Sequence, residues 1–185
     1  REGDLVCWIG PEIWEAEVAP EATIIEGDDK IVVSKARLTQ RLDTWNERTA
    51  RLFAADCAEH VLPLYEVEYP SDDRPRKALA AARDYAEGKI TEAEMTYSAY
   101  SPATAAVHDA ARGYAETSSR ASWSAAWTAE AAAWSASWTI LGADRAAWTT
   151  AGAARAAADT AGDAEREWQT ERLFLILYGG LYDET

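Results

Sequence analysis

Cys57 and His60 are the residues of this 185-residue chain whose types and spacing come nearest to a catalytic pair. Three positions apart on one helix, the two side chains would be neighbours, and an adjacent imidazole can activate a thiolate. A cysteine nucleophile also needs an orienting acid and an oxyanion hole, and cysteine is often simply buried. The sequence contains no GxSxG, no HExxH and no phosphate-binding glycine loop. We therefore expect no catalytic residues.

Ligands for a metal ion are equally scarce. The two cysteines, Cys7 and Cys57, and the two histidines, His60 and His108, fit no closed zinc pattern such as CxxC…CxxC. We expect no metal and no cofactor. The cysteines would form one disulfide at most, and no basic start followed by an apolar stretch precedes them. These features predict a reduced, cytoplasmic protein.

Acidic side chains dominate the charge of the sequence. The chain has 32 Asp and Glu against 18 Lys and Arg, a net charge of −14, whereas phosphate binding needs clustered cations. We therefore expect no direct nucleic-acid binding and a basic protein partner. The longest one-sign run of the helical part has no Lys or Arg and comprises Asp56, Glu59, Glu66, Glu68, Asp72 and Asp73. This run is either a solvated face or a docking surface for the partner.

Two cations follow this run directly, in the block Asp72-Asp73-Arg74-Pro75-Arg76. Asp72 or Asp73 is suited to cap a helix that begins near Pro75. We expect Arg74 or Arg76 to pair with an acid of a neighbouring element, which would give the block a role in folding. The rival interpretation makes both arginines contacts with the partner.

Tryptophans recur at helical spacing between Arg120 and Ala143. Four of them are separated by four, seven and four positions, and a fifth continues the seam: Trp123, Trp127, Trp134, Trp138 and Trp148. Alanines line the opposite side, so we expect this segment to be the central helix of a bundle. Trp45 and Trp168, on other predicted helices, are also expected in the core. The alternative is an exposed seam that binds a partner or forms a homodimer.

Glu130 lies angularly among these tryptophans. It is either a rim carboxylate that pairs with an arginine of another helix, or a buried functional carboxylate whose pKa is raised by desolvation. A membrane span is disfavoured, because the segment is rich in Ser, Thr and Ala, and Glu130 at its centre would cost roughly 2.5–3.5 kcal/mol. We expect a helix of a soluble protein.

The elements that position these residues fall into two predicted domains. Residues 1–35 contain short β-branched and aromatic runs and the turn Glu26-Gly27-Asp28-Asp29, which predict a β-hairpin or a three-stranded sheet. From about Lys35 the apolar spacing becomes helical, with Leu38, Leu42 and Trp45 on one face. The predicted fold class is mainly α, with a multi-helix bundle in residues 36–185 and strands only in the first 35 or so residues.

Capping residues and glycines mark the expected helices. Thr44-x-x-Glu47 is expected to cap a helix that bends at Pro63. Further helix boundaries are expected at Gly88, Thr91-x-x-Glu94, Ser101-Pro102, Gly162-Asp163 and Gly179-Gly180.

Several stretches of the helical part carry a resemblance to a known family. They are Cys57-Ala58-Glu59-His60-Val61-Leu62-Pro63-Leu64-Tyr65-Glu66, then Asp72-Asp73-Arg74-Pro75-Arg76-Lys77-Ala78, Ala81-Ala82-Arg83, Glu87-Gly88, Glu167-Trp168-Gln169 and Arg172-Leu173. With the Ala-rich middle, they resemble bacterial immunity proteins of the five-like group, whose relatives also occur in phage genomes. The resemblance covers roughly Leu42 to Leu177 and omits the β-rich start.

This resemblance implies a small, cytoplasmic, helical protein that binds and neutralises a protein effector without catalysis. The effector would be a toxin or, if the chain is phage-encoded, a host defence nuclease, and a DNA-mimicking mode of the anti-CRISPR type is a special case. The alternative hypothesis is a structural or assembly protein of a phage or cell that self-associates through its helices.

Overall fold

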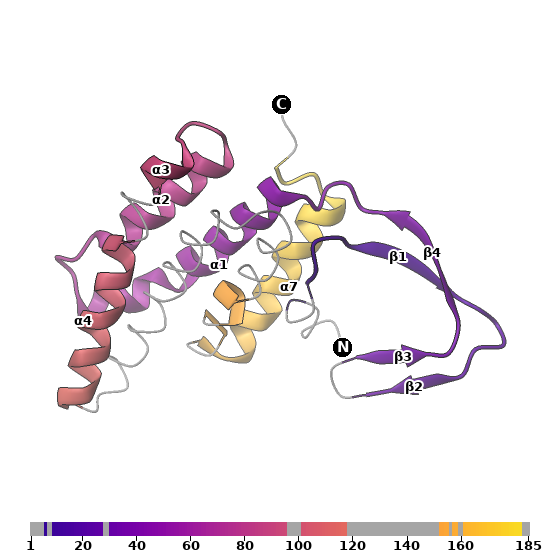
Figure 1. The fold of residues 1–185 in the computed structure, drawn as a ribbon. Helices are drawn as coiled ribbons and strands as arrows, with labels where there is room; N and C mark the ends of the chain where they lie inside the picture. Colours follow the sequence, from indigo (N-terminus) through magenta and orange to yellow (C-terminus); the bar gives the residue numbers. More distant parts are fainter. Residues whose placement is uncertain are drawn as a thin grey trace.

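The computed structural model describes residues 6, 9–27, 30–95, 101–117, 152–155, 157–158 and 161–182. Four strands come first: β1 (Trp14–Val18), β2 (Ile24–Glu26), β3 (Ile31–Val33) and β4 (Ala36–Arg41). The main helices follow: α1 (Glu47–Glu68), α2 (Arg74–Ala86), α3 (Glu92–Met95), α4 (Ser101–Thr117) and α7 (Asp163–Tyr178). The fold is mostly helical with strands near the N-terminus, as predicted (Figure 1).

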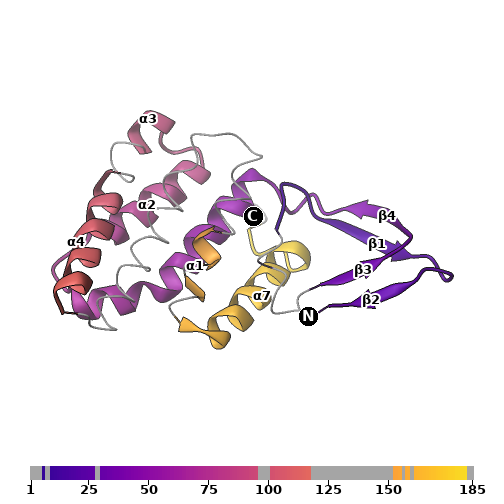
Figure 2. The ribbon, with the colours of Figure 1, turned by 60° about the horizontal axis from the view of Figure 1, so that its bottom comes forward.

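The four strands form one long antiparallel ribbon. β1 pairs with β4, and β2 pairs with β3 around the predicted hairpin turn. Between the two ladders, the Ala19 N–H donates to the Lys35 carbonyl at 3.2 Å, and the Ser34 N–H donates to the Thr23 carbonyl at 3.0 Å. Figures 1 and 2 show this ribbon leaving the helices beside the start of α1 and the end of α7. We call residues 12–41 the β arm.

The strands extend further along the chain than the sequence predicts. Leu38 lies four positions before Leu42, which suggests a helix, but Leu38 pairs with Ala16 in the β1–β4 ladder. The prediction that strands are confined to the first 35 residues is therefore wrong, because β4 runs to Arg41. A few apolar residues do not distinguish a helical period from a strand period, and the pairing with β1 decides.

The first apolar run of the chain, Leu5 to Ile9, falls within residues 1–35, in which the sequence predicts the strands. Its two members that the structure describes, Val6 and Ile9, lie outside the strands and are buried in the core beside Trp45. This start of the chain therefore packs against the helical part at those two residues.

α1 begins with a capping box that lies two positions later than predicted. The Thr49 N–H donates to Asn46 Oδ1 at 3.1 Å, and the Asn46 N–H donates to Thr49 Oγ1 at 3.0 Å. The predicted box of Thr44 and Glu47 is therefore wrong. The Thr44 hydroxyl instead donates to the Leu177 carbonyl at 2.9 Å, which ties the start of α1 to the end of α7.

α1 lies between α2 and α7 and is buried over much of its length (Figure 1). All residues from Thr49 to Ala58 are buried, so no side of this segment faces solvent. α2 and α7 both pack on α1, and α4 packs on α2 (Figures 1 and 2). Pro63 does not end α1, which continues to Glu68. The Pro63 side chain is on the exposed face of the helix.

Trp45 and Trp168 lie in and beside the core. The Trp45 ring is buried and meets the Phe53 ring edge-on, with centroids 6.1 Å apart. Its indole N–H donates to the Gly10 carbonyl at 2.9 Å, which satisfies the polar edge of the ring. Trp168 is partly buried against the same cluster, which also contains Leu173.

The later helix ends follow the sequence signals. Gly88, with φ of 70°, follows α2, and Gly162, with φ of 79°, precedes α7. Glu94 Oε2 accepts the Thr91 N–H at 2.8 Å, as expected for a capping box at α3. α4 begins at Ser101, and α7 ends just before Gly179.

The segment between Arg120 and Ala143, predicted to be the central Trp helix, lies outside the described residues. The predictions that fall there concern Trp123, Trp127, Trp134, Trp138, Trp148 and Glu130. The bundle arrangement around that helix and the division of the chain at residue 35 stay predictions. Among the described helices, none is both long and apolar enough to cross a membrane.

Candidate functional site

Asp56 is the centre of a charged cluster that joins three helices. Its carboxylate accepts a hydrogen bond from Arg172 Nε of α7 at 2.7 Å, and Arg83 Nη2 of α2 lies 2.7 Å from it. The Tyr182 hydroxyl also donates to this carboxylate. Burial, with the nearby Asp56 charge, raises the pKa of Tyr182. Asp56 is only 5% exposed. The sequence-based assignment of Asp56 to a docking surface is therefore corrected, because Arg83 and Arg172 neutralise its carboxylate inside the fold.

Glu59 and Glu66 pair with cations across the α1–α2 contact. Arg83 donates to Glu59 as well as contacting Asp56. Arg76 Nε and Nη2 donate to the two oxygens of Glu66 at 2.7 and 2.8 Å, a bidentate arrangement. The Arg76 hydrogen bond holds the pKa of Glu66 below its ordinary value. Unlike Asp56, both glutamates keep a substantial exposed surface.

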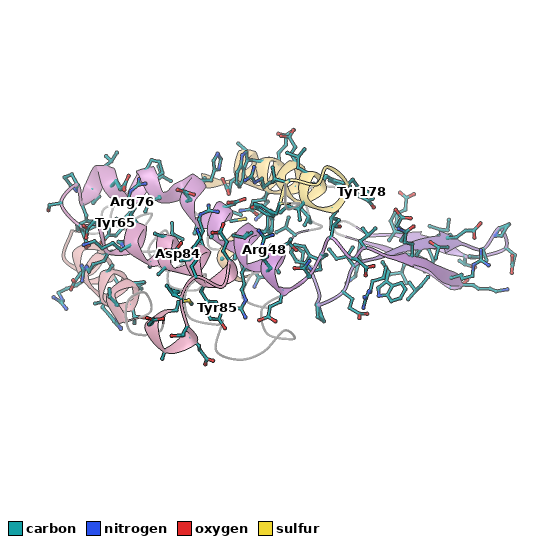
Figure 3. All side chains as sticks on the ribbon, turned by 90° about the horizontal axis from the view of Figure 1, so that it is seen from above. Arg48, Tyr65, Arg76, Asp84, Tyr85 and Tyr178 are labelled. Carbon is teal, nitrogen blue, oxygen red and sulfur yellow. The ribbon has the colours of Figure 1, made fainter. Side chains whose placement is uncertain are left out.

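Asp72 connects the start of α2 to α1 and, through Arg74, to α4. Its carboxylate accepts the Arg74 N–H at 3.1 Å, Arg74 Nε at 2.8 Å and the Tyr65 hydroxyl at 2.6 Å. The Arg74 side chain also donates to Asp109 of α4 at 2.8 Å. These bonds, with Arg74 as the largest cause, lower the pKa of Asp72 to about 2. Figure 3 shows Tyr65 and Arg76 together at the end of the helical part opposite the β arm.

The predicted pairing of the Asp72–Arg76 block is therefore present. Asp72 caps the first N–H of α2, while Asp73 makes no capping bond with its side chain. Asp73 instead lies 2.8 Å from the Lys77 ammonium one turn later. Arg74 and Arg76 each contact an acid of another helix, Asp109 and Glu66. The geometry gives both arginines a role in joining helices.

Glu165 is a buried carboxylate that the sequence analysis does not identify. It is 2% exposed, and it accepts hydrogen bonds from Gln169 Nε2 at 2.8 Å and contacts His60 Nδ1 at 2.5 Å. The His60 ring stacks on Trp168, with centroids 3.9 Å apart and planes 6° apart. The spacing of residues 165, 169, 173 and 176 follows the buried stripe of α7 and is a signal that could have located this residue.

Cys57 and His60 do not form a catalytic pair in this arrangement. The Cys57 side chain is fully buried and free of any disulfide. Burial, followed by the charges of Glu165 and Asp56, raises the pKa of the Cys57 thiol well above its ordinary value, so the thiolate is disfavoured. His60 is engaged with Glu165 instead. In the described part of the chain, no three His, Cys, Asp or Glu side chains converge to hold a metal ion.

The family comparison covers the helices that carry these contacts. The family model described as "Imm-5 like putative immunity protein" matches residues 40–174. The chain belongs to this Imm-5 like family. Comparison with curated proteins and with solved structures gives no significant match. The Imm-5 like span contains α1, α2, α3, α4 and most of α7, and the β arm lies almost entirely before it.

Within the Imm-5 like span, most acids of the acidic run form ion pairs with cations of the same chain. Asp56, Glu59, Glu66, Asp72 and Asp73 each have a cation within the chain. Glu68 is exposed at the end of α1. The sequence run thus contains one buried structural acid, one capping acid and several exposed acids on the α1–α2 side.

Proposed function

We propose that this protein is a non-catalytic inhibitor that binds and neutralises a protein effector. The single observation that carries this proposal is the match of the Imm-5 like immunity family to residues 40–174. Burial disfavours the Cys57 thiolate, and Glu165 and Trp168 hold the His60 ring. These contacts support a structural role for Cys57 and His60, the two residues that come nearest to a catalytic pair. The effector is a toxin or a defence nuclease, and the interaction takes place in the cytoplasm.

The proposed partner is basic and docks on the α1–α2 side of the helical part. The acids of this side that reach solvent are the exposed Glu59, Glu68 and Asp73 and the half-buried Glu66. The net charge of −14 would steer a basic partner to the protein, although salt screens such steering over about 8 Å at physiological ionic strength. Arg74 and Arg76 hold the acidic side chains in place and are secondary contacts. DNA mimicry would be a special case of this surface.

Capture and inhibition together test the proposal. The tagged full chain is used to capture proteins from a lysate of the encoding cells, and a captured protein is identified by mass spectrometry. The purified partner must then lose its toxic or nuclease activity when the chain is added in equimolar amount. A partner whose activity is unchanged, or self-association as the sole interaction, would contradict the proposed inhibitor function.

A matched pair of charge reversals tests the surface. Glu66→Lys with Glu68→Lys should slow association with the captured partner and reduce its dependence on salt. Glu167→Lys with Glu171→Lys makes the same change of net charge on exposed positions of α7. This control should associate with the partner faster than the Glu66→Lys, Glu68→Lys variant. Equal rates for the two double variants, with unchanged melting temperatures, would move the docking site away from the α1–α2 side.

A further inference from the structure

His60 has an exposed ring that a buried acid fixes from behind. Its side chain is 43% exposed, whereas the side chain of Glu165, whose Oε2 lies 2.5 Å from His60 Nδ1, is 1% exposed. The imidazole also stacks on the indole of Trp168, with the two planes 6° apart. The ring is therefore held along one edge and over one face, and the part that reaches solvent has a defined direction.

A second layer of contacts holds the acid itself. The buried Gln169 side chain places its Nε2 at 2.9 Å from the Ala154 carbonyl and at 2.8 Å from Glu165 Oε1. A carbonyl oxygen only accepts hydrogen bonds, so the group between these two oxygens is the NH2 of Gln169, which donates to both. Glu165 Oε1 is therefore an acceptor, and Oε2 is left to accept from His60.

The contact with Glu165 decides which nitrogen of His60 carries the proton. In a neutral imidazole, one ring nitrogen donates and the other accepts. An ionised carboxylate can only accept, so Nδ1 donates to Glu165 and the lone pair lies on Nε2. Within the described part of the chain, Nε2 has no hydrogen-bond partner. The surface of α1 thus presents a hydrogen-bond acceptor in a fixed orientation.

This arrangement exceeds what is needed to hold α7 against α1. Burying a carboxylate carries a desolvation penalty, and well-packed apolar residues of similar volume often stabilise such a contact equally well. A carboxylate behind an imidazole is, in contrast, a common way in which proteins orient a histidine toward a ligand. A ring that is fixed in advance also loses less entropy when a partner binds. The contacts of His60 therefore favour a role in binding.

The charge around His60 suits a cationic donor. From Glu59 to Glu68, α1 carries no Lys or Arg. Arg76 and Arg83 of α2 contact glutamates of this segment, but no Lys or Arg of the described residues contacts His60. Lys and Arg side chains donate hydrogen bonds and accept none, so they match the lone pair of Nε2 and the net charge of −14.

We propose that His60 Nε2 accepts a hydrogen bond from a Lys or Arg side chain of the effector. This inference rests on the proposed function and adds one named contact to it. Leu64 and Val67, one and two turns beyond His60 on the same face of α1, are exposed and would exclude water from this bond. Glu165 is a positioning residue, because it acts through His60 and is itself buried.

Nuclear magnetic resonance of the histidine rings tests the proton position without any effector. His60 and His108 are the two histidines of the chain, so labelling of histidine with a nitrogen isotope gives two rings to assign. At about pH 8, where an imidazole is ordinarily neutral, His60 should be in the Nδ1–H form. Glu165→Leu removes the acceptor and should shift the ring toward the Nε2–H form. A native ring in any other form, or one that Glu165→Leu leaves unchanged, would overturn the inference.

His60→Asn separates binding from folding. The asparagine amide can replace the Nδ1–H group toward Glu165, but it has no counterpart of Nε2. Its affinity for the captured effector should fall at least about tenfold, because a cation buried in the interface would lose its acceptor. His108→Asn makes the same change on an exposed histidine of α4 and should leave the affinity unchanged. Native affinity of His60→Asn would overturn the proposed contact.

Chemical modification tests the contact in the native chain. Diethyl pyrocarbonate acylates imidazole nitrogens that are accessible and unprotonated, and mass spectrometry locates the product. Both histidines should react in the free chain, and the captured effector should protect His60 but leave His108 reactive.

The outcomes distinguish this contact from the proposed function. An effector that is inhibited but leaves His60 as reactive as in the free chain would overturn the contact and keep the inhibitor function. Failure to capture any effector that the chain inhibits would overturn both, and the Nδ1–H form of His60 would then be a property of the fold alone.

Discussion

Arg172 Nε lies 2.7 Å from Asp56 Oδ2, although the two residues are 116 positions apart. Arg83 Nη2 lies 2.7 Å from Oδ1 of the same carboxylate, so a buried acid of α1 is the meeting point of α2 and α7. A buried ion pair adds little net stability by itself, but removing one partner leaves uncompensated charge. The cluster is therefore a point at which a single substitution should loosen three helices together.

Asp56→Ala should lower the free energy of unfolding by about 3–5 kcal/mol, because Arg83 and Arg172 would lose their shared carboxylate. Denaturant midpoints with unchanged slopes would measure the loss. Asp73→Ala is the matched control, since the exposed pair with Lys77 is expected to be worth about 0.2–0.5 kcal/mol. Similar losses for the two variants would mean that Asp56 is not the structural centre described above.

Arg76→Ala should lower the melting temperature slightly, because it removes the bidentate contact with Glu66 between α1 and α2. This pair is exposed, so a double-mutant cycle with Glu66→Ala should give a coupling of at most about 1 kcal/mol. Loss of partner capture by Arg76→Ala at unchanged stability would favour the rival interpretation, in which Arg76 is a partner contact.

Acid should destabilise the protein partly through Asp72. Its pKa is lowered in the folded state from the ordinary 3.8 to about 2, so the unfolded state takes up this proton first. The stabilisation is present above pH 3.8 and is lost as pH falls through about 2. Melting temperatures of Asp72→Asn should be lower near neutral pH and should fall less steeply over this window than those of the native chain. Parallel curves of melting temperature against pH for the variant and the native chain would contradict the assignment of this acid sensitivity to Asp72.

Cys57 should resist thiol reagents in the folded protein. Its side chain is fully buried, and burial raises the pKa of the thiol, so both access and thiolate formation are suppressed. In a Cys7→Ser background, alkylation at neutral pH should be slow in buffer and should become fast in denaturant. Rapid modification under native conditions would reopen a chemical role for Cys57.

Elements with local sequence signals can be predicted without knowledge of the fold. The hairpin around Gly27 and the ends of α2, α3, α4 and α7 agree with the predicted turns, caps and glycines. These signals act over a few residues, so no knowledge of packing is needed to interpret them. The family resemblance, which depends on local motifs such as the block around Arg74, is likewise confirmed over residues 40–174.

The role of each charged side chain depends on how the helices pack. The acidic run suggested one surface, yet Asp56 is an interior residue because α2 and α7 bring Arg83 and Arg172 to it. The buried carboxylate of α7 is Glu165, held by His60 from a helix more than 100 positions earlier. β4 likewise became a strand through hydrogen bonds with β1. An ion pair or a strand ladder forms only where a distant element packs alongside. The spacing of residues within one segment does not identify that element.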